Sequence, residues 1–363
     1  MSPLETEIRR RIAAAGPMPV GEYMALCLSD PAHGYYVTRD PLGAKGDFTT
    51  APEVSQMFGE LIGLWAVAVW RQMGTPRQLR LIELGPGRGT LLRDAVRAAT
   101  IDPQFIRALE LHLVEISPVL QALQQQTLVD RNLPKLWHKA LADVPPGPAI
   151  IIANEFFDAL PINQAVKQDD GWHARGVGIG EDGQLAYTVS PEPLRGFERT
   201  VPAQLRAAQN GEVFEWRSDI EAMELGRRVA RDQSAALVID YGHTESGAGE
   251  TLQAVHKHLF ADPLTMPGEA DLTAHVDFQE LIRAVESMGV NAYGPLEQAA
   301  FLNRLGIQTR AQNLKANLPR AEAHEIDQAL ARLTGIGRTG MGTLFKVVAL
   351  THRDLPPPPG FEH

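Results

Sequence analysis

The stretch LRLIELGPGRGTLL at residues 79–92 constrains the fold of this chain more than any other. Residues 79–84 are largely apolar, as in a short buried strand, although Arg80 interrupts the run. A turn with glycine at every second position follows, and Thr90 is predicted to cap the helix that begins after it. A strand, a glycine turn and a helix form the first half of a nucleotide-binding βαβ unit, in which glycine lets the backbone approach a ligand closely.

The acid and the glycines of this stretch follow the pattern E-x-G-x-G-x-G, from Glu83 through Gly85 and Gly87 to Gly89. A dinucleotide-binding turn has G-x-G-x-x-G instead, and its third glycine would fall at Thr90. The observed pattern resembles the first motif of class I methyltransferases that use S-adenosylmethionine. That cofactor has no pyrophosphate, and its cationic groups favour a carboxylate near the turn. A purely structural turn is the alternative, and we favour cofactor binding.

Composition excludes several classes of protein. The chain has 363 residues, enough for one large domain with insertions or for two domains. Its formal net charge of −10 argues against nucleic acid as a partner and suits basic peptide or protein segments better. The single cysteine, Cys27, excludes an intramolecular disulfide and a cysteine-rich zinc site, and its apolar surroundings predict core packing. We expect no bound metal.

The chain shows no sign of a membrane segment. The apolar run at residues 61–70 is about half the length that a membrane span requires. Residues 1–16 contain acids and bases but lack the apolar core of a signal peptide. We therefore expect a cytoplasmic protein without membrane insertion, and an oligomer is compatible with the sequence.

The chain is predicted to divide into three parts. Residues 1–77 are expected to form an N-terminal helical cap with a cofactor-covering loop. Residues 78–350 are expected to form the main α/β domain, with insertions at about 162–217 and 244–335, and residues 351–363 a proline-rich tail. The first insertion has alternating runs separated by Asp-Gly turns, which are typical of β-hairpins.

The segment that leads into the helix predicted at residues 54–73 has its own composition. Thr50 and Glu53 have the spacing of a capping box for that helix. Just before them stand Gly46, Asp47 and Phe48, within a long loop dense in glycine, proline and aromatic residues. Such a loop either covers a ligand or is pinned to the core by its aromatics, and the sequence favours neither.

Polar residues also follow three further predicted strands. Glu115, with Ile116 after it, ends the strand at 111–115, where Rossmann-like sites bind ribose hydroxyls. Ligands of open α/β sheets bind beyond the carboxyl ends of the strands, so these positions favour chemistry. The other candidates follow the strands at 149–153 and 235–240: Asn154, Glu155, Asp158, Tyr241 and His243. The alternatives are that Asn154 caps a helix and that Asp158 lies on a helix surface.

Seven motifs, taken together, resemble the MidA-like methyltransferases. That family includes the mitochondrial complex I assembly factor that methylates arginine on a protein subunit. The matches run in order from about residue 17 to residue 350: GDFTTAPE, ELGPGRG, VEISP, ANEFFDALP, IDYGH, ADLTAHVDF and GTLFKVVAL.

The resemblance implies a Rossmann-like class I methyltransferase sheet with an N-terminal helical cap and inserted substrate-side β-hairpin and helical elements. It implies S-adenosylmethionine as the cofactor, with Gly85 and Gly87 beside its methionine part and Glu115 on its ribose. Asn154 and Glu155 would position the substrate, and Asn154 would also contact the cofactor. Three further residues would close over the cofactor: Gly46, Asp47 and Phe48.

The mechanistic hypothesis is transfer of a methyl group to an arginine nitrogen of a protein partner, for which a respiratory complex subunit is one candidate. The guanidinium is charged at ordinary pH, so the site needs carboxylates to hold it and accept its proton. We expect Glu155 and Asp158 in this role, with Tyr241 and His243 as secondary candidates. Two alternatives remain: a small-molecule methyltransferase, and a cofactor-binding assembly or scaffold protein without essential catalysis.

Overall fold

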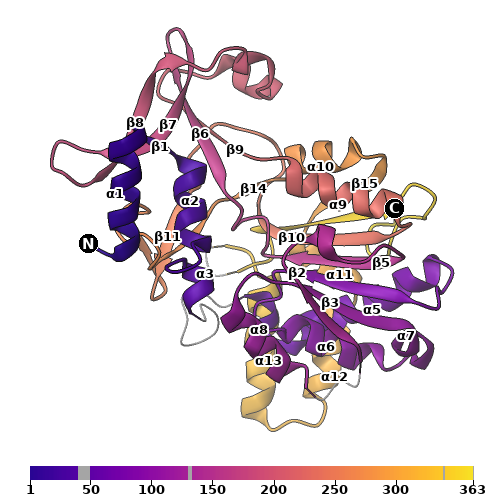
Figure 1. Cartoon of the computed structure of the whole chain (residues 1–363). Helices are drawn as coiled ribbons and strands as arrows, with labels where there is room; N and C mark the ends of the chain where they lie inside the picture. Colours follow the sequence, from indigo (N-terminus) through magenta and orange to yellow (C-terminus); the bar gives the residue numbers. More distant parts are fainter. Residues whose placement is uncertain (40–49, 130–132, 338–339, 363) are drawn as a thin grey trace. The chain divides into compact units, whose positions relative to one another are not determined.

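The computed structural model describes residues 1–39, 50–129, 133–337 and 340–362 (Figure 1). The described residues form two compact units, each assembled from three segments of the chain. Unit 1 is drawn from Met1–Phe48, Asp158–Asp219 and His243–Glu280. Unit 2 is drawn from Thr49–Phe157, Ile220–Gly242 and Leu281–His363. The division of the chain at residues 77 and 350 stays a prediction.

Unit 2 contains a mostly parallel sheet with the strand order β15-β16-β10-β5-β2-β3-β4. Figure 1 labels β15, β10, β5, β2 and β3 of this sheet. Neighbouring strands from β10 to β4 are parallel, and β16 is antiparallel to both of its neighbours. The strands are β2 (Leu79–Leu84), β3 (Leu109–Val114), β4 (Lys135–His138), β5 (Ala149–Asn154), β10 (Ala235–His243), β15 (Val290–Glu297) and β16 (Phe345–His352). The predicted Rossmann-like α/β sheet is confirmed, and residues of β2, β5 and β10 are buried on both faces, as expected of a parallel sheet between helices.

The helices of unit 2 are α4 (Ala51–Val54), α5 (Gln56–Gln72), α6 (Thr90–Ala99), α7 (Pro103–Ala108), α8 (Pro118–Thr127), η1 (Leu141–Asp143), α9 (Ile220–Arg231), α11 (Gln298–Arg304), α12 (Ile307–Lys315) and α13 (Arg320–Thr334). Helix α10 (Phe278–Glu286) spans the boundary between the two units.

Unit 1 holds a sheet with the order β1-β7-β6-β9, in which β8 also pairs with β7, and a small sheet with the order β12-β11-β13. The antiparallel pairs β6–β7 and β7–β8 confirm the hairpins predicted within residues 162–217. Its elements are α1 (Pro3–Ala15), β1 (Met18–Pro19), α2 (Val20–Ser29), α3 (Tyr35–Thr38), β6 (Ile162–Gln168), β7 (Gly171–Ile179), β8 (Leu185–Pro193), η2 (Phe197–Arg199), η3 (Ala203–Ala207), β9 (Val213–Arg217), β11 (Gln253–His256), β12 (Leu259–Ala261), β13 (Asp271–Thr273) and β14 (Val276–Asp277).

No helix within the described ranges is long and apolar enough to cross a membrane. Cys27 is buried among apolar side chains of unit 1, as its sequence context predicts.

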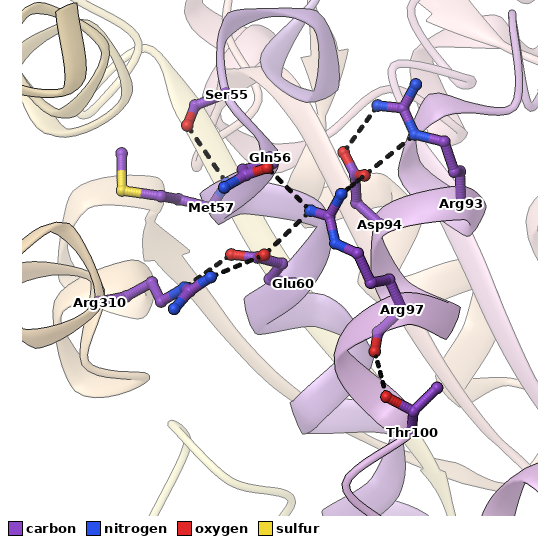
Figure 2. Close-up of polar contacts among 9 residues, drawn as sticks. All are labelled: Ser55, Gln56, Met57, Glu60, Arg93, Asp94, Arg97, Thr100 and Arg310. Carbon is purple, nitrogen blue, oxygen red and sulfur yellow. Dashed lines mark hydrogen bonds and ion pairs between the residues drawn. The ribbon is translucent and has the colours of Figure 1, made fainter. Parts of the chain in front are cut away.

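The predicted side-chain caps of two helices are not formed, although Thr50 does occupy the N-cap position of α4. The helix expected at residues 54–73 is interrupted at Ser55, which caps α5 by accepting a hydrogen bond from the Met57 amide at 3.2 Å (Figure 2). Thr90 is the first residue of α6 rather than its cap, and Gly89 takes the cap position. The Thr90 hydroxyl instead donates to the Glu53 carboxylate at 2.5 Å. A contact between distant residues thus uses the two side chains that local spacing assigns to caps.

A buried carboxylate joins three helices of unit 2. Glu60 on α5 accepts hydrogen bonds from Arg97 on α6 at 2.9 Å and from Arg310 on α12 at 2.7 and 2.9 Å (Figure 2). Asp94, also buried, pairs with Arg93 and Arg97. Pairing of both oxygens offsets the cost of burying the Glu60 charge, and loss of one partner from such a group typically costs about 3–5 kcal/mol.

Helices α5 and α6 pack with their backbones in contact. A Cβ atom on Gly63 would lie 2.2 Å from the carbonyl oxygen of Ala95 and 2.6 Å from its Cα atom. Within a helix, alanine in place of glycine ordinarily stabilises by about 1 kcal/mol. Here the clash reverses the sign, and we expect Gly63→Ala to destabilise the protein by about 2 kcal/mol or more in urea unfolding.

The matched control is Gly247→Ala, because a Cβ atom there meets no atom within 4 Å. This variant should unfold at the urea concentration of the parent. Equal stability of Gly63→Ala and the parent would show that the two helices are not in backbone contact.

Candidate active site

The glycine turn after β2 requires glycine at each of its three positions. Gly85, Gly87 and Gly89 have φ angles of +60°, +52° and +80°, in the left-handed region that other residues rarely adopt. The Gly85 amide donates to the carbonyl of Val114 at 3.0 Å, which joins the turn to the end of β3. A Cβ atom on Gly85 would lie 3.2 Å from the ring of Phe156, so the turn also packs closely against the segment after β5.

Glu83 lies near the end of β2 and is 3% exposed. Its Oε2 atom is buried, and no described residue hydrogen-bonds to it. Burial, and to a lesser extent the negative charge of Glu115, raise the pKa of Glu83 well above its usual value. A buried carboxyl oxygen without a partner is costly in a folded protein unless a ligand satisfies it, and the ligand that suits two neighbouring carboxyl groups is cationic.

Glu115 follows β3 and is held at both oxygens. Its Oε1 accepts from the Ser117 amide at 2.8 Å and its Oε2 from the Gln124 side chain at 3.1 Å. Its own amide donates to the His138 carbonyl at 2.9 Å, which joins it to β4. Burial raises the pKa of Glu115 to about 6, although these donors oppose the shift. Ile116, the next residue, is 48% exposed, so its apolar side chain is accessible to a ligand.

Gln124 is a site residue that the sequence analysis missed. It is fully buried on α8, and its Nε2 atom donates to the Gly87 carbonyl at 2.7 Å as well as to Glu115. One sequence signal could have revealed it. Leu120, Gln124 and Leu128 recur at a spacing of four, which places a polar side chain in the buried stripe of the helix.

The turn after β5 contains a strained residue. Glu155 has a φ angle of +50°, and a residue other than glycine in this region costs about 1–2 kcal/mol. Its amide donates to the Ile239 carbonyl at 2.9 Å, and its Oε1 accepts from the Ala51 amide and the Asn154 side chain, each at 3.2 Å. Asn154 Oδ1 is buried, and the described part of the chain gives it no hydrogen-bond donor. Strain held by surrounding contacts is common at functional sites.

Asp240, near the end of β10, holds this turn in place and was also missed. It is fully buried, and its two carboxylate oxygens accept from the amides of Phe157 and Tyr241, both at 2.9 Å. The available signal was an acid ending a strongly apolar strand in the sequence IDYGH.

Helix α4 connects the two turns. Its Glu53 contacts the glycine turn through Thr90 and, at 3.9 Å, through Arg88. Its first amide, that of Ala51, bonds Glu155 after β5. Gly46, Asp47 and Phe48, predicted to cover the cofactor, lie outside the described residues.

Asp158 and Glu155 fall in different units, and the pairing expected for them stays a prediction. Asp158 is 5% exposed, and its carbonyl accepts from the Ala274 amide at 3.1 Å and from Arg217 at 3.2 Å. The two alternatives for this segment are wrong, because no helix begins at Asn154 and Asp158 is not on a helix surface.

Tyr241 and His243 have different surroundings. Tyr241 is 7% exposed, and its ring packs edge-on against Phe345 with the centroids 5.5 Å apart. His243 lies 3.6 Å from the Asp277 carboxylate within unit 1. The catalytic roles of both residues stay predictions.

These residues of unit 2 fit S-adenosylmethionine. The buried Glu83 oxygen suits a cationic group, the fixed carboxylate of Glu115 suits a ribose diol, and the glycine turn allows close approach of a ligand. Residues 61–296 match the model of Methyltransf_28, a family of S-adenosyl-L-methionine-dependent methyltransferases. The chain belongs to this family. It is an S-adenosylmethionine-dependent methyltransferase, and the predicted likeness to MidA-like enzymes is confirmed.

Two named relatives match this chain over most of their own length. The Drosophila melanogaster protein named protein arginine methyltransferase NDUFAF7 homolog, mitochondrial, is 36% identical over 99% of this chain and 88% of its own. The Homo sapiens NDUFAF7 is 36% identical over 88% of this chain and 77% of its own.

A solved structure has the same fold. A COG1565 superfamily member from Burkholderia thailandensis, bound to S-adenosyl-homocysteine, is 28% identical with a TM-score of 0.83. The match covers 99% of this chain and 92% of that one.

The raised pKa of Glu83 predicts that its buried carboxylate lowers the stability of the free protein and favours binding of the cofactor. Because the folded pKa lies above the usual 4.5, stability is lost as pH rises from that value toward the folded pKa. Glu83→Gln removes this loss. We expect its melting temperature to exceed that of the parent by a margin that grows as the pH rises above 4.5, while its affinity for S-adenosylmethionine falls.

Calorimetry in buffers of different ionisation enthalpy adds a second measurement. S-adenosylmethionine should release protons from the parent on binding, and fewer from Glu83→Gln. The exposed acid in Glu221→Gln serves as the control. Parallel melting curves of Glu83→Gln and the parent at every pH would contradict a buried, ligand-linked charge.

Proposed function

We propose that this protein methylates an arginine nitrogen on a protein partner. The observation that carries the proposal is the agreement of relatives named protein arginine methyltransferases, which match this chain at 36–37% identity over most of its length. The more specific prediction of a respiratory complex subunit as the partner is part of the same proposal, and so is the cytoplasmic location.

The turn after β5 supports this proposal chemically. A guanidinium presents several N–H donors in one plane and carries a full positive charge, so it needs acceptors and a negative group close together. Glu155 supplies a carboxylate, with Oε1 oriented by Ala51 and Asn154. Asn154 Oδ1 supplies a second, buried acceptor. Together they would localise the positive charge on one side of the guanidinium, and the Glu155 carboxylate would accept a proton from the nitrogen that gains the methyl group.

S-adenosylmethionine supplies the activated methyl group when bound. The protein then has to align the acceptor nitrogen and exclude water. Glu83, the glycine turn and Glu115 would hold the cofactor, and α4 joins that turn to Glu155. Asp158 and Tyr241 are proposed as further contacts to the acceptor.

Glu155→Gln tests the catalytic part. The amide oxygen of glutamine can still accept from Ala51, so the turn should persist while the negative charge is lost. We expect turnover to fall about 100-fold or more, as for loss of a general base, with affinity for S-adenosylhomocysteine within about threefold of the parent. The control is Glu286→Gln, at an exposed position of α10. Comparable losses in turnover and cofactor affinity would contradict the catalytic role of Glu155.

The acceptor is identified by radiolabelling. Purified protein and tritiated S-adenosylmethionine are added to an extract of cells that lack the gene, and labelled proteins are hydrolysed to amino acids. The proposal expects label in methylarginine. Label in small molecules alone would support the small-molecule alternative. Rescue of the deletion strain by the Glu155→Gln variant would support the assembly or scaffold alternative.

A further inference from the structure

We propose that Gln124 is a positioning residue for the cofactor ribose: it orients the Glu115 carboxylate and fixes that carboxylate relative to the glycine turn. The inference depends on the S-adenosylmethionine site and not on the identity of the methyl acceptor. It concerns a helix residue that contacts both cofactor-binding segments of the site.

The geometry leaves the amide of Gln124 one orientation. The indole of Trp137 can only donate, and its Nε1 atom lies 2.8 Å from Gln124 Oε1. The Gly87 carbonyl and the Glu115 carboxylate can only accept, and both face Nε2, at 2.7 and 3.1 Å. A flipped amide would set donor against donor and acceptor against acceptor. With no exposed surface, Gln124 has no solvent to compensate such a flip.

This network fixes the plane of the Glu115 carboxylate. The Ser117 amide holds one oxygen and Gln124 the other, so the group cannot rotate about its terminal bond without losing a buried hydrogen bond. A carboxylate accepts at about four lone-pair sites, and the bonds from Ser117, Gln124 and the Ile116 amide leave capacity for a further donor. Two oxygens in a fixed plane match the two neighbouring hydroxyls of a ribose.

The same side chain fixes the glycine turn. Gly87 has a left-handed backbone, and its carbonyl is held by Gln124. A second side chain of α8 reinforces the arrangement, because the Nε2 atom of Gln121 donates to the Glu115 carbonyl at 2.8 Å. Helix α8 therefore sets the distance between the turn and the ribose carboxylate.

Gln124 also favours the charged form of Glu115. Burial raises the pKa of Glu115 to about 6, and the hydrogen bonds from Ser117 and Gln124 act in the opposite direction. Removing the Gln124 donor should raise this pKa further. A protonated carboxyl group is a poorer acceptor for hydroxyl groups, so ribose binding should weaken at higher pH values than in the parent.

The test compares two ligands in two variants. Gln124→Met keeps the length of the side chain and removes its hydrogen bonds, and Gln125→Met changes the exposed neighbour on the same helix as a control. The ligands are S-adenosylhomocysteine and its 2′,3′-dideoxyribose analogue, titrated by calorimetry. We expect the parent and Gln125→Met to prefer the hydroxylated ligand by about tenfold or more, and Gln124→Met by less than about threefold.

The ratio of the two affinities separates positioning from a merely structural role. An effect on folding or on the turn alone would lower the affinities for both ligands equally. The ratio of the two affinities would then equal that of the parent, and this result would overturn the proposal. The pH at which S-adenosylhomocysteine affinity falls gives a second readout. It should shift upward in Gln124→Met, and an unshifted profile would overturn the proposal.

A milder variant covers the case in which Gln124→Met fails to fold. Trp137→Phe removes the donor that orients the amide and part of the indole ring, but leaves in place the Gln124 donor and its two acceptors. It should reduce the preference for the hydroxylated ligand to a value between those of the parent and Gln124→Met. A preference equal to that of the parent would show that the amide orientation does not matter for ribose binding.

Discussion

The loops around the site in unit 2 depend on carboxylates at the carboxyl ends of buried parallel strands. Glu83, Glu115, Glu155 and Asp240 stand at the ends of β2, β3, β5 and β10, and each is largely removed from water or held by backbone amides. Burial of a carboxylate is unfavourable without partners. The amides that satisfy three of these groups therefore determine the shapes of the loops around the site.

Buried polar groups that already have hydrogen-bond partners in the protein position the site. Buried polar groups without such partners are candidates for binding a ligand. The two carboxylate oxygens of Asp240 accept hydrogen bonds from the amides of Phe157 and Tyr241, and these bonds shape the turn that carries Glu155. Glu83 Oε2 and Asn154 Oδ1 are buried and receive no hydrogen bond from the residues described here. Atoms of this second kind are the ones for which a ligand would provide the missing partner.

Local patterns were sufficient for the fold and the cofactor turn. The apolar run before Gly85, the left-handed glycines and the acid at Glu115 follow from the requirements of a buried strand and a tight turn, which depend on neighbours in sequence. The same local rules placed Thr50 at an N-cap, as found, but predicted capping hydrogen bonds that are not made, and the side chains of Thr90 and Glu53 bond each other instead.

Gln124, Asp240 and the role of α4 depend on residues that are distant in sequence. Gln124 contacts Gly87, which is 37 residues away, and the Asp240 carboxylate receives the amide of Phe157, 83 residues away. Nothing in the composition of a short window encodes such pairs. The sequence determined which strands are buried and where glycine turns carry a cofactor. Only packing of the sheet decided which buried polar groups find partners, because a hydrogen bond forms only between groups that the fold brings within about 3 Å.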